Sequence, residues 1–173
     1  MIKALLFDFG GTLLLEERDK HLGDMELRLV PGAEAFLRWA YERYALMVVS
    51  NTVASYAVDI RDVLAQCGLS EFFKDVVTSL DYGAEKPDAG IFQFACARLG
   101  VRPSEAVMIG DRVEKDIRGA KRAGLHAVLL CSRPEAAAAS QTPFDQPDRV
   151  AASYPEIVSY LNELREKEGV GVR

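Results

Sequence analysis

Short apolar runs recur along the chain and predict buried β-strands. Four of these runs are rich in branched side chains, and a fifth is weaker. The strong runs are Ala4 to Phe9, Ala45 to Ser50, Ala106 to Ile109 and Ala127 to Leu130, and the weaker one is Asp75 to Thr78. Uninterrupted apolar runs of this length are typical of strands that are covered on both faces of a parallel sheet.

Between the runs, apolar residues recur with the spacing of a helix, and five helices are predicted. Their apolar faces are marked by Phe36, Leu37, Ala40, Tyr41 and Tyr44, then by Ala57, Ile60 and Leu64, by Ile91, Phe92, Ala95, Cys96 and Leu99, by Val113, Ile117 and Ala120, and by Ile157, Val158, Leu161 and Leu164. Strands that alternate with helices favour right-handed crossovers. We therefore predict a three-layer α/β fold with a mostly parallel central sheet.

The length and composition favour a single domain that spans residues 1–173. A chain of 173 residues that is 49% hydrophobic and 27% charged can bury a full core, but it is too short for two large domains. Residues 13–30 are predicted to form a short flap before the first helix. Residues 132–153 contain three prolines and are predicted to form an irregular surface segment.

Charge and cysteine usage narrow the class of protein. The net charge of −5 and the pI near 5.1 argue against a general affinity for nucleic acid or an anionic membrane. The three widely spaced cysteines favour buried thiols over disulfides or a metal site. The N-terminus lacks the pattern of a signal peptide, and no apolar run is long enough to span a bilayer. We expect a cytoplasmic protein.

Polar residues follow the predicted strands at one edge of the sheet. Asp8 follows the first strand, Ser50 ends the second, and Asp111 follows the fourth, while Lys86 and Asp116 lie in the loop and helix nearby. Each residue alone has an ordinary explanation, such as a helix cap or a solvated side chain. Their convergence changes the interpretation, because ligands bind where the carboxyl ends of parallel strands meet.

Three carboxylates gathered at one edge need a cation. Like charges raise one another's pKa unless a positive charge lies among them. Mg²⁺ is a hard ion that prefers oxygen ligands and often combines carboxylates with phosphate and water. The pattern therefore favours a Mg²⁺ cofactor.

Four ordered motifs resemble the signature motifs of the haloacid dehalogenase-like (HAD) hydrolase superfamily, whose members are mostly phosphatases. They are "LLFDFGGTLL", "LMVVSNT", "AEKPDAGIF" and "VMIGDRVEKDIRGAKRAG", and the resemblance covers about residues 3 to 130. The resemblance implies a Rossmann-like core and a phosphoric monoester hydrolase. It also implies an aspartyl-phosphate intermediate.

The resemblance implies a phosphorylated substrate and a role for individual residues of the motifs. Asp8 would be the nucleophile, Ser50 would bind a phosphoryl oxygen, and Lys86 would neutralise charge and hold Asp8. Mg²⁺ would be held by Asp8, the backbone carbonyl of Gly10, Asp111, and Asp116 through water. Substrate contacts are expected from Gly11 and Thr12, whose backbone can approach a phosphate, and from Asn51 and Arg112.

Gly10 departs from the pattern, because most phosphatases of the superfamily carry a second aspartate there as the general acid and base. Three readings stay open. The first is a working phosphatase with a good leaving group or another acid, for which Glu16 and Glu17 are candidates. The second is a slow or inactive protein that binds a phosphorylated ligand or a partner. The third and weakest is a dehalogenase or phosphonatase.

The spacing between the motifs leaves no room for an inserted cap domain. Asp8 and Ser50 are 42 positions apart, and Ser50 and Lys86 are 36 apart. In this superfamily an uncapped site implies a bulky substrate, such as a phosphorylated macromolecule, or a lid from a second subunit of a homo-oligomer. The basic run along the fourth helix is interpreted as a solvated face, with Arg112 as the exception that could contact a phosphate; the run comprises Arg112, Lys115, Arg118, Lys121 and Arg122.

Overall fold

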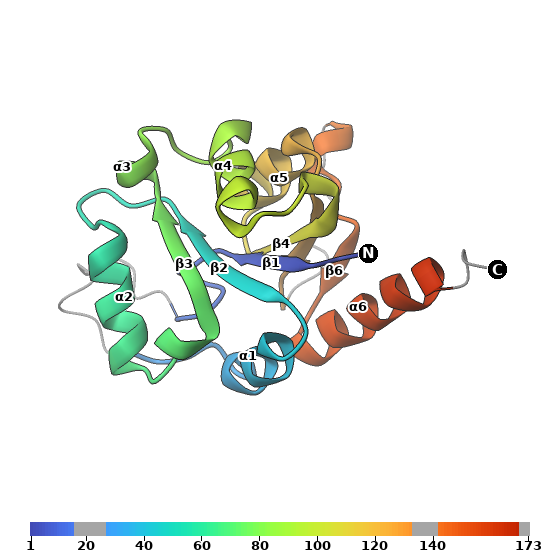
Figure 1. The fold of residues 1–173 in the computed structure, drawn as a ribbon, viewed down its shortest axis with the longest axis horizontal. Coiled ribbons are helices and arrows are strands. Elements are labelled where there is room, and N and C mark those ends of the chain that lie inside the picture. Colours follow the sequence, from blue (N-terminus) through green and yellow to red (C-terminus); the bar gives the residue numbers. More distant parts are fainter. Residues whose placement is uncertain (16–26, 133–141, 170–173) are drawn as a thin grey trace.

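The computed structural model describes residues 1–15, 27–132 and 142–169. Within this part of the chain, six parallel strands form one sheet in the order β3-β2-β1-β4-β5-β6 (Figure 1). The strands are β1 (Ala4–Phe7), β2 (Ala45–Ser50), β3 (Phe73–Thr78), β4 (Ala106–Gly110), β5 (His126–Leu130) and β6 (Arg149–Ala151). The predicted parallel α/β sheet is confirmed.

Helices connect the strands. The α-helices are α1 (Ala33–Tyr41), α2 (Ala57–Gln66), α3 (Ser79–Tyr82), α4 (Ala89–Leu99), α5 (Arg118–Ala123) and α6 (Tyr154–Gly169). Shorter helical turns are η2 (Ser70–Phe72), η3 (Pro103–Glu105), η4 (Val113–Ile117) and η6 (Pro143–Asp145), of which η4 is a turn of π-helix that runs directly into α5. All five predicted helices are present.

The sequence prediction was wrong for part of residues 132–153. The segment was expected to be irregular, but β6 lies within it and pairs in parallel with β5. A strand of three residues is too short to show a periodic pattern, and only its pairing with a neighbour defines it. Residues 133–141 of this segment lie outside the described residues.

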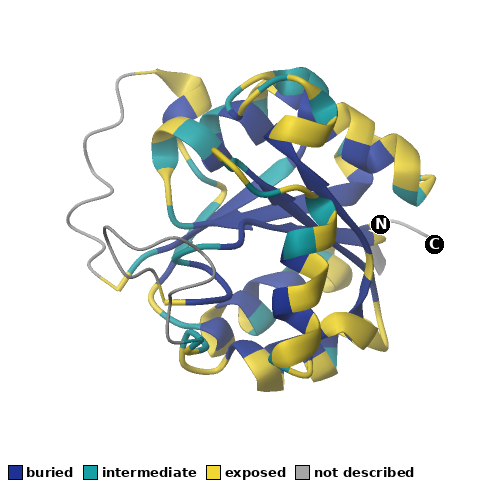
Figure 2. Ribbon diagram, turned by 90° about the vertical axis from the view of Figure 1, so that its left-hand side faces the viewer, coloured by how far each residue is buried: buried dark blue, intermediate teal, exposed yellow. Residues whose placement is uncertain are grey.

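The sheet is covered on both faces, as Figures 1 and 2 show. Successive side chains of a strand point to opposite faces. In β1, Leu5 and Phe7 pack in the cluster that includes α1, α2 and α6, whereas Ala4 and Leu6 pack with α4 and α5. All four of these residues are fully buried. This arrangement confirms the three-layer fold.

The strand order brings the candidate residues together. The chain runs from β1 outward to β2 and β3, then returns to place β4 on the other side of β1. Such a reversal opens a crevice at the carboxyl ends of the central strands. The backbone amide of Asp8 donates to the carbonyl of Ile109 at 3.0 Å, so the end of β1 is fixed against the end of β4.

The described ends of the predicted flap, residues 13–30, pair with each other. The amide of Leu15 donates to the carbonyl of Arg28 at 2.8 Å, and the amide of Val30 donates to the carbonyl of Leu13 at 2.9 Å. Residues 16–26, which include Glu16 and Glu17, lie outside the described residues. Leu14 also bridges to Gly10, so the paired ends themselves lie beside the end of β1.

The described residues contain no inserted cap domain, since the connections between their strands hold only the helices given above. None of the helices in this part of the chain combines the length and the apolar character needed to cross a membrane.

Candidate active site

A buried lysine lies between two carboxylates at the centre of the site. The Nζ atom of Lys86 lies 2.7 Å from Oδ1 of Asp8 and 2.6 Å from Oδ1 of Asp116. It also donates to the backbone carbonyl of Val49 at 2.8 Å. Lys86 is only 2% exposed, and these three acceptors match the three donors of its ammonium group. The ion pair therefore fixes the relative positions of β1, the loop before α4, and η4.

Burial and charge shift the pKa values of this cluster. Burial raises the pKa of Asp116 to about 6, with Lys86 acting in the opposite direction and Asp8 adding to the increase. For Lys86, burial disfavours the charged form, but attraction to Asp8 and Asp116 outweighs it and raises the pKa. Lys86 is therefore held as a cation.

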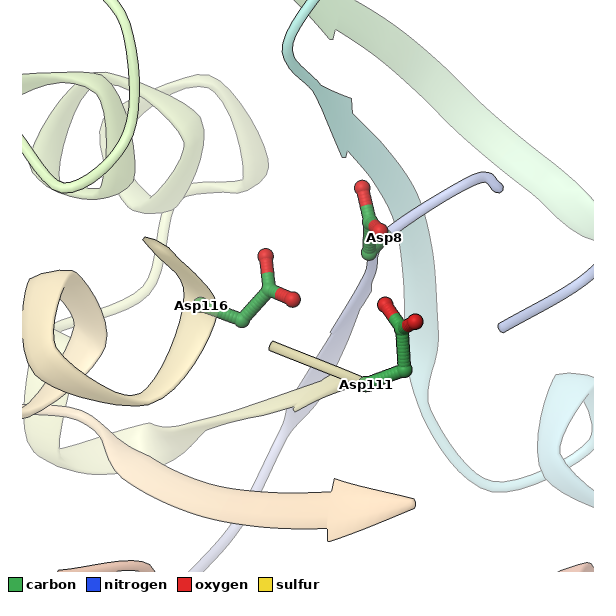
Figure 3. A group of neighbouring side chains, drawn as sticks. All are labelled: Asp8, Asp111 and Asp116. Carbon is green, nitrogen blue, oxygen red and sulfur yellow. The ribbon is translucent and has the colours of Figure 1, made fainter. Parts of the chain in front are cut away.

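Three carboxylates face one another across the crevice, as Figure 3 shows. Asp8, Asp111 and Asp116 each offer an oxygen, and these oxygens lie within 4.8 Å of one another. An all-oxygen donor set of this kind fits a hard divalent cation such as Mg²⁺. The part of the chain that the structure describes thus brings together all three carboxylates predicted to hold metal.

Two glycines allow these carboxylates to approach the backbone. A Cβ atom on Gly11 would lie 2.3 Å from Oδ2 of Asp111, and one on Gly110 would lie 2.4 Å from Cγ of Asp116. Gly11 also has a φ of 75°, which L residues with side chains rarely adopt. Each glycine leaves room for a carboxylate that a larger residue would displace.

Asn51 holds the backbone of Lys86 in both directions. Its Nδ2 atom donates to the Lys86 carbonyl at 2.9 Å, and its Oδ1 atom accepts from the Lys86 amide at 2.8 Å. The side chain was predicted to contact substrate, and that role stays a prediction. The observed contacts make Asn51 a positioning residue for Lys86.

A cavity of about 390 Å³ opens beside Asp8 and Lys86. It is lined on the β1 and β2 side mainly by apolar and small residues, and on the β4 side by basic ones. The lining residues are Asp8, Phe9, Gly10, Leu14, Leu15, Ser50, Asn51, Thr52, Val53, Ala54, Ser55, Ile60, Lys86, Arg112, Lys115 and Asp116. The volume suits a small phosphorylated molecule.

The predicted substrate contacts differ in their placement. Ser50 and Arg112 line the cavity, and the Ser50 hydroxyl makes only a long contact of 3.5 Å to the carbonyl of Asn51. Gly11 and Thr12 are not among the lining residues. Thr12 is fully buried, and its carbonyl accepts a hydrogen bond of 2.6 Å from the hydroxyl of Tyr154. Their contacts with substrate stay predictions.

Several lining residues were missed by the sequence prediction, Lys115 and Val53 among them. Lys115 was assigned to a solvated helix face, and Val53 was given no role. The signal for Lys115 was its position between Asp111 and Asp116, because η4 begins beside the crevice. For Val53 the signal was an apolar side chain in the loop that follows β2.

The chain belongs to the haloacid dehalogenase-like hydrolase family. The model of that family matches residues 15–124, which include Ser50, Lys86, Asp111 and Asp116. The matched residues begin after Asp8.

Several curated relatives are phosphatases by name. The chain is 42% identical over 137 residues to the phosphoserine phosphatase of Thermus thermophilus, covering 75% of this chain and 53% of that protein. It is 50% identical over 74 residues to the glyceraldehyde 3-phosphate phosphatase of Methanopyrus kandleri, covering 43% of this chain and 32% of that protein. The chain thus spans about half or less of the length of these relatives.

Solved structures match almost the whole chain. An uncharacterized protein from Listeria monocytogenes serotype 4b has a TM-score of 0.82 at 30% identity, with 95% of this chain and 99% of that chain covered. A HAD phosphatase from Thermococcus onnurineus has a TM-score of 0.74 at 25% identity, with 92% and 98% covered. The fold of the family is therefore shared beyond the matched motifs.

Proposed function

We propose that this protein is a Mg²⁺-dependent phosphatase that hydrolyses a phosphomonoester through an aspartyl phosphate on Asp8. The observation that carries the proposal is the buried Lys86 ammonium between Asp8 and Asp116, next to a cluster of three carboxylates. A carboxylate must approach a dianionic phosphate, and that approach is favourable only where positive charge has been arranged beforehand.

The residues divide the chemistry between them. A carboxylate oxygen of Asp8 attacks phosphorus, the bond from phosphorus to the ester oxygen breaks, and the alcohol leaves with a proton from solvent. Water then attacks the aspartyl phosphate, releases inorganic phosphate, and regenerates the carboxylate. Lys86 holds Asp8 in one orientation through the contact of 2.7 Å. When bound, Mg²⁺ would neutralise charge on the phosphoryl oxygens.

Ser50 and the metal ligands complete the phosphoryl site. The Ser50 hydroxyl lines the cavity, and its long contact of 3.5 Å to the Asn51 carbonyl leaves it able to donate to a phosphoryl oxygen. Asp111 and Asp116 would hold Mg²⁺ together with Asp8, with the backbone carbonyl of Gly10 as a further ligand.

Because Gly10 has no acidic side chain, we infer a narrower range of substrates and a second candidate function. Among the described residues, Asp8 and Asp116 are the only carboxylates that line the cavity. Loss of a general acid typically costs about 10²–10⁴ in rate. We infer that the substrate has a good leaving group, or else that the protein binds a phosphorylated ligand and turns it over slowly.

The names of the relatives support small substrates. They include phosphatases of phosphoserine, of glyceraldehyde 3-phosphate and of ribulose-1,5-bisphosphate. A compact phosphomonoester fits a cavity of about 390 Å³ better than a phosphorylated macromolecule does, although the opening would admit the end of a larger one.

The test is the release of phosphate from an activated aryl phosphate and from an acyl phosphate, with and without Mg²⁺. The native chain is compared with Asp8→Asn and with Asp62→Asn, an exposed carboxylate on α2. We expect Mg²⁺-dependent release by the native chain and by Asp62→Asn, and none above background by Asp8→Asn.

Two results would overturn the phosphatase. One is release that continues in Asp8→Asn, because the nucleophile would then be elsewhere. The other is no release with either substrate at any Mg²⁺ concentration. In that case binding of phosphate analogues by calorimetry tests the second candidate, a ligand-binding protein.

A further inference from the structure

Basic side chains on η4 and α5 fall into two groups. Lys121 pairs with Asp148 at 2.7 Å, Arg118 pairs with Asp145, and Arg122 lies over the ring of Phe144 with its Cζ atom 5.9 Å from the centroid. These three side chains face η6 and the loop before β6. The prediction of a solvated basic face is therefore wrong for Arg118 and Lys121.

The second group faces the cavity. Arg112 and Lys115 both line it, and neither side chain makes an ion pair or a hydrogen bond with any residue in the described ranges 1–15, 27–132 and 142–169. Lys115 is half-buried, so part of its hydration has been lost without a counter-ion to replace it. A cation in this situation is available for an anionic ligand.

The ammonium of Lys86 is already paired with carboxylates, so Arg112 and Lys115 are cations in addition to the one at the phosphoryl site. Lys86 contacts both Asp8 and Asp116, and all three of its donors are used. Arg112 is held through its backbone: its amide donates to Oδ2 of Asp116 at 3.1 Å, and its carbonyl accepts from the amide of Asp116 at 2.8 Å. Neither its guanidinium nor the Lys115 ammonium forms an ion pair with the described carboxylates of the cluster.

The sheet order gives the cavity two chemically different sides. Arg112 and Lys115 follow β4 and Val53 follows β2, on opposite sides of β1 and Asp8, whereas Leu15 follows β1 itself. Val53 is 97% exposed, although it is an aliphatic side chain at the edge of a binding cavity. A ligand whose phosphate lies at Asp8 thus has an apolar wall on one side and two cations on the other.

We propose that Lys115, assisted by Arg112, binds a second anionic group on the organic part of the substrate. The inference rests on the proposed phosphatase function and narrows its substrate class to phosphomonoesters that carry a carboxylate or a second phosphate. The apolar wall formed by Leu15 and Val53 contacts the carbon skeleton between the two anionic groups. Charge-assisted contacts of this kind are stronger than neutral ones.

The probes are three benzylic phosphonates, in which a carbon-phosphorus bond replaces the ester bond that a phosphatase would hydrolyse. They are 4-(phosphonomethyl)benzoate, the corresponding carboxamide, and 1,4-bis(phosphonomethyl)benzene. The carboxamide keeps the shape of the benzoate without its charge, and the bisphosphonate separates a preference for phosphate from one for carboxylate. Dissociation constants are measured by calorimetry in the presence of Mg²⁺, so the test does not depend on turnover.

Native protein is expected to bind the benzoate or the bisphosphonate about tenfold more tightly than the carboxamide, as charge-assisted contacts allow. In Lys115→Met this preference falls to less than about threefold, because one of the two cations is lost. Lys74→Met, which removes an exposed lysine on β3, leaves the preference as in the native protein.

Several outcomes would overturn the second-anion site. They are equal affinity for the charged and neutral probes, a preference that survives in Lys115→Met, binding of none of the probes, and equal weakening of all three probes by Lys115→Met. The last result would mean that Lys115 serves the phosphoryl group itself. Any of them can occur while Asp8-dependent phosphate release persists, so the phosphatase and the second-anion site stand or fall separately.

Discussion

The side-chain amide of Asn51 and the backbone of Lys86 form a closed pair of hydrogen bonds, of 2.9 and 2.8 Å, across 35 positions of the sequence. Asn51 directly follows β2, and Lys86 lies in the loop before α4. Both residues line the cavity. The pair fixes the position of the Lys86 backbone, from which its ammonium reaches Asp8. It therefore links the loop after β2 to the contacts of Lys86 with Asp8 and Asp116.

Asn51→Ala is expected to lower both stability and activity. Two backbone groups of Lys86 would lose their partners, which costs about 1–3 kcal/mol of unfolding free energy. A displaced lysine would lower kcat by about tenfold or more, since small shifts of catalytic groups are costly. Denaturant unfolding and phosphate release measure the two effects.

Asn162→Ala is the matched control, because Asn162 is an exposed asparagine on α6. It should leave both quantities as in the native chain. A normal kcat in Asn51→Ala would show that Lys86 keeps its position without the amide pair.

Gly11→Ala is expected to weaken Mg²⁺ binding. The new Cβ would lie 2.3 Å from Oδ2 of Asp111, so the carboxylate has to move. The substitution also places alanine at a φ of 75°, which costs roughly 1–2 kcal/mol. The measurement is the increase of the unfolding temperature with Mg²⁺ concentration, which reports binding to the folded state.

Gly68→Ala separates the two effects. Gly68 has a similar φ of 69°, but nothing lies within 4 Å of the position of its Cβ. It should lose stability as Gly11→Ala does, yet keep the native dependence on Mg²⁺. If both variants respond to Mg²⁺ alike, the contact with Asp111 is not what positions the metal ligands.

The sequence predicts the residues of the site better than it predicts their contacts. Asp8, Ser50 and Asp111 could be placed because the carboxyl ends of parallel strands meet at one edge. The pairing of Asn51 with Lys86 depends on how two loops approach each other, and no local pattern reports that. Lys115 was missed for a related reason, because η4 is a wide π-turn whose faces differ from those of a regular helix.

Glu105, at the other end of the sheet, forms ion pairs with two largely exposed cations, Arg102 and Lys3, and these pairs predict a pH dependence of stability. Glu105 accepts from the Arg102 guanidinium at 3.0 Å and lies 2.8 Å from Nζ of Lys3. The hydrogen bond from Arg102, and then that from Lys3, lowers the pKa of Glu105 from 4.5 to about 2. The ionised form is therefore favoured by folding.

Because the folded-state pKa lies below the unfolded one, this contribution is fully present above pH 4.5 and is lost as the pH falls towards 2. Glu105→Gln should lower the unfolding temperature at pH 7, by a small amount because the two cations are largely solvated. The difference from the native protein should shrink between pH 4.5 and pH 2. Thermal unfolding across this range measures it, and a difference that is independent of pH would mean that packing, and not charge, is responsible.

Gly10 lines the cavity directly after Phe9, at the position where the resemblance to the superfamily motif leads us to expect an acid. Unlike Gly11, it is not among the glycines with positive φ, so its backbone conformation does not disfavour a side chain. Gly10→Asp would supply a proton to the leaving alcohol and then activate water. If the missing acid limits the native protein, turnover of an unactivated alkyl phosphate should rise by about 10²–10⁴.

The controls for this increase are Gly10→Asn, which adds a side chain of the same size without an acid, and the double variant with Asp8→Asn. The increase should be absent from both. Activated aryl phosphates should gain less than alkyl phosphates, because their leaving groups need little protonation. An equal gain for both substrates, or a gain in Gly10→Asn, would mean that the side chain acts by reshaping the cavity and that proton transfer is not the limiting step.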